Sequence, residues 1–260
     1  MTENPNPPKN EWEFFPDELE SVLDEIRARP ELLMEIPWAR IFLATARLEE
    51  LKNEDIRTFR GHRETVAKDV VDYNIESMRQ NLGLDRVDRL IGPLLSIDTI
   101  RQNISDLDIL TVGPRTEAEL FTLLGLGFAA DRIRGLDLIS YNPLVDLGDM
   151  HDMPYDADRF DVIVVGWTLT YSKDVRRVCD EIVRVARPGA TIAIGINMNQ
   201  YTLEERKKRE GDSFLDATYY KTTKEILDHF EGKIAAMIFH HDVDPAVQPT
   251  GELIVIFRLV

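Results

Sequence analysis

The most restrictive feature of the sequence is a nearly unbroken apolar segment, Phe160–Gly166 (FDVIVVG), which is followed by an amphipathic helix and a second apolar segment, Thr191–Ile196. An apolar run of this length is typical of a strand that is buried on both faces of a parallel sheet. The intervening segment, Ser172–Arg187, predicts a helix with one purely apolar face, made of Val175, Val178, Cys179, Ile182 and Val185. A strand, a helix and another strand in this order predict an α/β fold.

The same alternation begins upstream, near Asp106. Further strands are predicted over 108–112, 133–138, 145–147, 233–240 and 252–259, with a glycine turn at Gly113 and a helix over 117–126. Thr222 and Glu225 form a capping box that opens one more helix before the last two strands. We therefore expect seven strands in an open sheet, with the binding crevice at the carboxyl ends of the parallel strands.

Three segments divide the chain. Residues 1–15 are polar and rich in proline, so we expect a disordered tail. Residues 16–105 show helical periodicity over 17–29, from 37, over 63–82, over 85–91 and over 97–104, with Gly92-Pro93 predicted to end the fourth helix. No Gly- or Ser-rich linker separates them from the α/β domain, 106–260. We therefore expect an N-terminal helical layer that packs on the core.

Charge and cysteine content exclude several functions. The 260 residues include 47 acidic and 31 basic side chains, giving a formal net charge of -16, so nucleic-acid binding is not expected. The basic run 206–209 is flanked by glutamates and predicts a solvated helix face. Cys179 is the single cysteine, and we expect it to be a buried packing residue in a reducing compartment. With no apolar run of ~20 residues and no signal-like N-terminus, we expect a cytoplasmic protein without a membrane segment.

The sequence motifs of the core resemble those of a known family. The segments LDILTVGPRTEAEL (107–120) and GDMHDMPYDADRFDVIVVG (148–166), with RPGA (187–190) before a strand, resemble the class I S-adenosylmethionine (SAM) dependent methyltransferases. The resemblance covers 106–196 well and the last third loosely. It implies a Rossmann-like, mostly parallel sheet whose last strand is antiparallel, SAM as cofactor, and methyl transfer as the reaction.

The first glycine turn departs from the family pattern. Members of the family end the first strand with an acid that is followed by three alternating glycines. Here Thr111 takes the place of the acid, Gly113 keeps the first glycine, and Arg115 and Glu117 replace the other two. Two interpretations follow. Either Arg115 pairs with the methionyl carboxylate while Glu117 or Glu119 receives the ammonium, or the site is degenerate.

Other cofactor-binding residues are implied by the positions that follow each strand. Asp137, with Leu138 beside it, lies 24 residues after Gly113, near the spacing of ~20 residues at which an acid accepts hydrogen bonds from ribose hydroxyls. The resemblance implies that Asp149 receives the adenine amino group and that Met150 supplies an apolar wall. It also places Gly166 and Trp167 at the cofactor, where an indole could stack on adenine or attract the sulfonium.

No catalytic residue can be named from the pattern. His151 is a weak candidate for a general base, because histidine titrates near neutrality, but a hydrogen-bonded loop residue is the alternative. Tyr171 is a second weak candidate that could reach a substrate. His240 and His241 are neighbours on a predicted strand and point to opposite faces, so we expect no metal site there.

The sequence thus predicts a SAM-dependent methyltransferase that acts on an N or O acceptor of a small molecule, or of a protein. A homo-oligomer is compatible with the sequence. The competing hypothesis is a catalytically inactive methyltransferase-fold protein that serves as a binding or regulatory subunit. A third hypothesis, an NAD-dependent oxidoreductase, is disfavoured because Arg115 stands where a dinucleotide-binding turn needs glycine.

Overall fold

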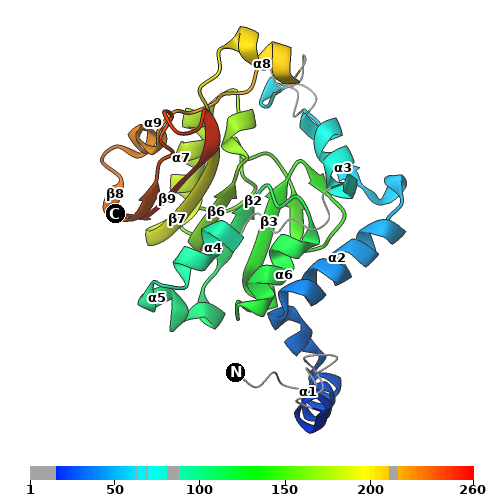
Figure 1. The fold of residues 1–260 in the computed structure, drawn as a ribbon. Helices are drawn as coiled ribbons and strands as arrows, with labels where there is room; N and C mark the ends of the chain where they lie inside the picture. Colours follow the sequence, from blue (N-terminus) through cyan, green and yellow to red (C-terminus); the bar gives the residue numbers. More distant parts are fainter. Residues whose placement is uncertain (1–15, 62–63, 68–69, 81–87, 211–215) are drawn as a thin grey trace, which may run out of the picture.

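The computed structural model describes residues 16–61, 64–67, 70–80, 88–210 and 216–260. Its centre is a seven-stranded sheet with helices packed against it (Figure 1). The strands, in spatial order, are β5 (Val145–Leu147), β3 (Ile133–Asp137), β2 (Ile109–Val112), β6 (Phe160–Gly166), β7 (Ala186–Asn199), β9 (Thr250–Leu259) and β8 (Ile234–His241). The predicted disordered tail, 1–15, lies outside the described residues.

The direction of the strands confirms the predicted sheet. β5, β3, β2, β6 and β7 pair in parallel, whereas β9 is antiparallel to both of its neighbours, β7 and β8. The chain order therefore reverses between β2 and β6, and at such a switch point the loops at the carboxyl ends of adjacent strands leave a crevice. The apolar runs predicted an open α/β sheet, and the resemblance implied that it is mostly parallel and Rossmann-like; the structure confirms both.

Side chains along β6 show why this sheet is buried on both faces. Val162 and Val164 belong to one hydrophobic cluster, and Ile163 and Val165 belong to the other, so alternate residues face opposite layers. The first cluster takes in α4 (Asp88–Leu94), α5 (Asp98–Arg101) and α6 (Glu117–Gly125). The second takes in α3 (Val70–Gln80), α7 (Val175–Val185) and α9 (Thr223–Leu227). The fold has three layers.

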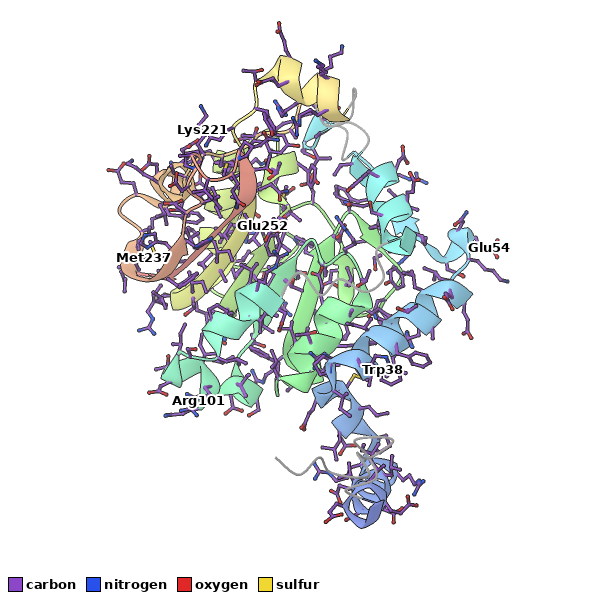
Figure 2. All side chains as sticks on the ribbon, in the orientation of Figure 1. Trp38, Glu54, Arg101, Lys221, Met237 and Glu252 are labelled. Atoms are coloured by element: carbon purple, nitrogen blue, oxygen red, sulfur yellow. The ribbon has the colours of Figure 1, made fainter. Side chains whose placement is uncertain are left out.

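The N-terminal segment contributes to these layers and also extends beyond them. A 3-10 helix, Pro30–Glu35, and α2 (Pro37–Glu50) pack on α6, while α4 contacts β7. α1 (Pro16–Ala28) contacts the 3-10 helix and lies apart from the sheet (Figure 1). Figure 2 shows Trp38 on the outer side of α2, where its side chain is 70% exposed. None of the described helices is long and apolar enough to cross a membrane.

Several element boundaries differ from the predictions. α4 continues through Pro93 to Leu94, because a proline in the last turn of a helix sacrifices only one backbone hydrogen bond. α7 begins at Val175, since Asp174 caps it by accepting a hydrogen bond from the Arg177 amide at 3.1 Å. Pro188-Gly189 was predicted to lie between elements. It lies inside β7, at the irregular stretch between the pairs Phe160–Ala186 and Val162–Thr191, where a strand tolerates proline.

Two short strands were not predicted at all. β1 (Arg57–Thr58) pairs antiparallel with β4 (Ile139–Ser140) in a separate two-stranded sheet. The remaining helices of the described segments are α8 (Leu203–Glu210) and 3-10 turns at 53–55, 104–106, 130–132, 169–171 and 228–230. The pairing of β1 with β4 fixes the N-terminal segment beside the loop that follows β3, and so brings that segment to the crevice.

Candidate functional site

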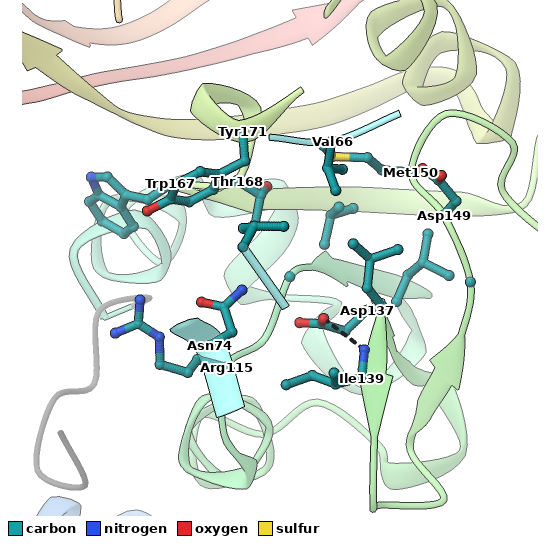
Figure 3. A pocket seen from close by; sticks show the side chains of 16 residues that line it. Val66, Asn74, Arg115, Asp137, Ile139, Asp149, Met150, Trp167, Thr168 and Tyr171 are labelled. Atoms are coloured by element: carbon teal, nitrogen blue, oxygen red, sulfur yellow. Dashed lines mark hydrogen bonds between the residues drawn. The ribbon is translucent and has the colours of Figure 1, made fainter. Parts of the chain in front are cut away.

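A cavity lies where β2, β3 and β6 end. Its walls come from the loops after these strands, from the loop after β5, and from the N-terminal segment (Figure 3). The lining residues are Val66, Val70, Asn74, Val112, Gly113, Arg115, Leu136, Asp137, Leu138, Ile139, Gly148, Asp149, Met150, Trp167, Thr168 and Tyr171. Its volume of about 60 Å³ is small beside the roughly 300–1,000 Å³ of typical ligand pockets. A nucleoside-sized ligand would therefore have to widen it.

The glycine turn after β2 is held tightly. Gly113 has a φ of +74°, and its amide donates a 2.8 Å hydrogen bond to the carbonyl of Leu136. A Cβ at this position would lie 1.9 Å from Cγ2 of Thr168. Glycine is therefore required twice, by the left-handed backbone and by the approach of Thr168. Thr111, which replaces the acid of the family, is a buried residue of β2.

The two replaced glycines have different surroundings. Arg115 lines the cavity, as the predicted pairing with a carboxylate requires. Glu117 does not line it. Its carboxylate is almost completely buried and accepts hydrogen bonds from Arg47, at 2.7 and 3.0 Å, and from the side-chain amide of Asn142. Because those donors already use its carboxylate, the structure gives Glu117 a role in joining α2 to α6 rather than the expected position at a cofactor ammonium.

Asp137 ends β3 in the middle of the cavity wall, and Leu138 follows it on the same wall. The Oδ1 atom of Asp137 accepts a 3.1 Å hydrogen bond from the amide of Ile139, which fixes the rotamer of the side chain. The side chain is partly exposed. The carboxylate thus lies at the cavity wall, as an acid that binds a ribose needs.

Asp149 and Met150 lie at one end of the cavity, opposite Arg115 and Trp167, with Asp137 between them (Figure 3). Asp149 is buried, and its Oδ1 accepts a hydrogen bond from the amide of His151 at 2.9 Å. Burial acts to raise the pKa of Asp149, but the hydrogen bonds from His151 and Thr65 outweigh it, so the pKa lies below its ordinary value. The carboxylate is therefore ionised at neutral pH.

His151 does not line the cavity. Its Nδ1 lies 2.6 Å from Oδ1 of Asp149, and its Nε2 lies 2.7 Å from Oγ of Ser172. These are the residue types of a nucleophilic triad, but Ser172 is only 1% exposed and is absent from the cavity wall. Its Oγ also accepts a 3.1 Å hydrogen bond from the amide of Asp174. A buried serine without access to a substrate does not support nucleophilic catalysis.

Trp167 follows β6 and lines the other end of the cavity. Its φ of +58° is uncommon for a bulky residue and marks a strained position. The guanidinium carbon of Arg89 lies 4.7 Å from the ring centroid, so one face of the indole already carries a cation. Tyr171, a candidate for contact with substrate, also lines the cavity, whereas Gly166 pairs with Gly195 inside the sheet and does not.

Sequence reasoning missed one wall of the cavity. Val66, Val70 and Asn74 come from the N-terminal segment and from α3. The segment Thr65–Ala67, which we call the strap, is bound to the loop after β6: Val66 forms a bridge with Ser172, the Ala67 amide donates to the Tyr171 carbonyl at 2.7 Å, and the Lys173 amide donates to the Thr65 carbonyl at 2.9 Å. No local pattern in the sequence could have paired these distant segments.

Other candidate groups lie away from the cavity. Burial raises the pKa of Cys179 to about 12, which makes the thiol a packing group rather than a nucleophile. His240 and His241 lie on β8, and within the described part of the chain no cluster of three His, Cys, Asp or Glu side chains is placed to hold a metal ion. The cavity between β3 and β6 is therefore the candidate site.

Comparisons with known proteins identify a related family and related folds. Residues 128–194 match the family described as a methyltransferase domain. A protein from Galdieria sulphuraria, assigned as a sarcosine dimethylglycine methyltransferase, is 13% identical, with 72% of this chain and 98% of that chain covered and a TM-score of 0.50. A Listeria monocytogenes protein assigned as a SAM-dependent methyltransferase is 12% identical, with 65% and 99% covered and a TM-score of 0.47. The comparison with curated proteins finds no match.

At 13% identity the similarity to the Galdieria sulphuraria protein shows the fold alone. The family match is a sequence similarity, and it covers the segment that begins just after α6 and continues through the Asp149 loop and β6 into β7. Together they confirm the resemblance that the sequence showed: the chain has the Rossmann-like fold of the class I SAM-dependent methyltransferases, and its residues 128–194 match the methyltransferase domain family.

Proposed function

We propose that the protein is a SAM-dependent methyltransferase that uses this cavity and acts on an N or O acceptor, most simply of a small molecule. The observation that carries the proposal is the order of groups along the cavity: a cation at one end, a carboxylate in the middle, and an acid beside an apolar wall at the other end (Figure 3). SAM presents matching groups in the same order, namely a carboxylate, ribose hydroxyls and an adenine.

Individual residues fit the cofactor chemically. Arg115 would pair with its carboxylate, Asp137 would accept from the ribose hydroxyls, and Asp149 with Met150 would hold the adenine. An additional sign of a missing polar ligand is Oγ1 of Thr168, a buried atom that has no hydrogen-bond partner among the described residues. Thr168 lines the cavity near Gly113, so a ligand there would satisfy its hydroxyl.

SAM, when bound, supplies an activated methyl group on a sulfonium. The chain itself has to hold an acceptor atom in line with that group and exclude water, and positioning of this kind can provide most of the rate enhancement. Trp167 and Tyr171 line the cavity toward the end of β6, and the strap covers it from the N-terminal side. The net charge of -16 favours cationic or neutral acceptors over anionic polymers.

A second function has specific support. A cavity of about 60 Å³ and the replacement of two glycines by Arg115 and Glu117 would also suit a fold that has lost its cofactor and serves as a binding subunit. In that case the strap would be a permanent part of the wall and not a segment that yields to a ligand.

Methyl transfer can be tested directly. The purified protein is incubated with SAM labelled in its methyl group and a small-molecule fraction rich in amines and hydroxy compounds, and labelled products are separated. Acceptor-dependent transfer that disappears in Asp137→Ala and persists in Asp131→Ala, an exposed control carboxylate, supports the enzyme. Absence of transfer together with absence of cofactor binding supports the binding subunit.

A further inference from the structure

The loop after β5 and the loop after β6 are joined by a buried hydrogen-bonded chain. It runs from Thr65 through Asp149 and His151 to Ser172, with contacts of 2.6, 2.6 and 2.7 Å. Asp149, His151 and Ser172 are all at most 5% exposed. Asp149 alone of these residues faces the cavity. The others therefore act on the cavity only through the carboxylate that they hold.

The direction of each hydrogen bond follows from the donors available. Nδ1 of His151 faces an ionised carboxylate, which can only accept, so Nδ1 carries a proton. In the neutral ring Nε2 then accepts from the hydroxyl of Ser172, whose oxygen accepts in turn from the amide of Asp174. Asp149 thus selects the tautomer of His151, and Ser172 holds the ring in place from its other side.

The acceptor sites of Asp149 are almost filled. Oδ1 accepts from the amide and from Nδ1 of His151, and Oδ2 accepts from the hydroxyl of Thr65 at 2.6 Å. A carboxylate offers about four lone-pair sites, so among the described contacts one remains, on Oδ2. A ligand in the cavity can be recognised by this carboxylate only as a single N–H or O–H donor to Oδ2.

We propose that His151, fixed by Ser172, is a positioning residue that keeps Asp149 as an acceptor-only group and so makes the cavity select a 6-amino purine over a 6-oxo purine. The inference rests on the proposed function, because it requires that the adenosyl group of the cofactor lie beside Asp149. An ionised carboxylate accepts from an exocyclic amine and repels a carbonyl oxygen. Without the Nδ1 donor of His151, a buried carboxyl becomes protonated more easily, and a protonated carboxyl can donate to a 6-oxo group.

The test compares the dissociation constants of S-adenosylhomocysteine and S-inosylhomocysteine by calorimetry. The wild-type protein should prefer the adenosyl compound by about tenfold or more, the scale of one hydrogen bond to a charged group. His151→Leu should lose most of this preference, and Ser172→Ala part of it. His151→Asn can keep a donor near the Nδ1 position and should retain more of the preference than His151→Leu does.

The control is Thr122→Val, which removes a buried, hydrogen-bonded hydroxyl on α6 that does not line the cavity. It should leave the preference unchanged. If His151→Leu does not fold, Ser172→Ala still decides, because it should lose part of the preference. A wild-type preference that survives in every folded protein among His151→Leu and Ser172→Ala overturns the role of His151 while the proposed function stands. Binding of neither compound by folded wild-type protein overturns the proposed function itself, and this inference with it.

Discussion

The hydroxyl of Thr65 donates a 2.6 Å hydrogen bond to Oδ2 of Asp149, two residues that are 84 positions apart in the chain. One belongs to the strap and the other to the loop after β5, so the bond ties the N-terminal segment to the wall of the candidate site. The same carboxylate lines the cavity. Asp149 therefore both holds the strap closed and is available to bind a ligand.

The strap should therefore control entry of the cofactor. Thr65→Val removes the bond to Asp149 at nearly constant volume, so the strap should open more easily, and the association rate constant for S-adenosylhomocysteine should rise severalfold for the roughly 1 kcal/mol of a lost hydrogen bond. Stopped-flow tryptophan fluorescence would measure this rate constant, because Trp167, one of the three tryptophans, lines the cavity, and Thr122→Val is the control. An unchanged association rate would mean that the strap does not limit entry.

Arg115 should recognise a carboxylate specifically. Arg115→Leu should raise the dissociation constant of S-adenosylhomocysteine by about ten- to a hundredfold, as expected for the loss of a charge-assisted hydrogen bond. The same substitution should leave 5'-methylthioadenosine, which lacks the amino-acid portion, nearly unaffected. Calorimetry with both compounds makes the comparison. Equal losses for the two ligands would show that Arg115 supports the turn and not the ligand.

Glu117 should matter for stability and not for ligand binding. Arg47→Met leaves the buried carboxylate without its cation and should cost on the order of 3 kcal/mol, the low end of the range for a broken buried pair, because the Arg47 side chain is 60% exposed. Adding Glu117→Met should recover part of that loss, since an apolar pair needs no desolvated charge but leaves the Asn142 amide without its acceptor. Urea denaturation measures the free energy of unfolding of the single and the double variant. A double variant less stable than the single one would contradict this account.

The low pKa of Asp149 predicts that its contribution to the free energy of unfolding depends on pH. Hydrogen bonds from His151 and Thr65 hold the folded-state pKa below that of the unfolded chain, so the carboxylate stabilises the fold above the unfolded pKa of about 4. The contribution is lost as the pH falls from there through the folded-state pKa. The difference in unfolding free energy between the wild type and Asp149→Asn should therefore be constant near neutrality and shrink below about pH 4. A difference that does not change with pH would contradict it.

The sheet could be predicted from the sequence because its signals are local. Phe160–Gly166 and Val145–Leu147 were predicted with their observed bounds, since an apolar run between turn residues specifies a buried strand without reference to the rest of the chain. The loops after these strands were expected at one edge of the sheet for the same reason, and Asp137, Asp149 and Trp167 all line the cavity there.

What the sequence could not predict depends on contacts between distant segments. The pairing of β1 with β4, the strap over the cavity and the ion pair of Arg47 with Glu117 each join residues dozens of positions apart. Helical periodicity placed Asn74 on a helix but could not indicate which neighbour that helix would cover. Glu117 was assigned to the cofactor because it occupies the position of a glycine, whereas its side chain extends to α2.

The central claim is that this cavity holds the cofactor of a methyltransferase, and titration of the wild-type protein with S-adenosylhomocysteine in a calorimeter tests it most directly. The account predicts saturable one-to-one binding with a dissociation constant on the order of micromolar, equivalent to about -8 kcal/mol. It predicts that Asp137→Ala weakens this binding by about tenfold or more while Asp131→Ala does not. A folded sample that releases no heat with either S-adenosylhomocysteine or SAM would contradict the account and identify the chain as a methyltransferase fold that serves another purpose.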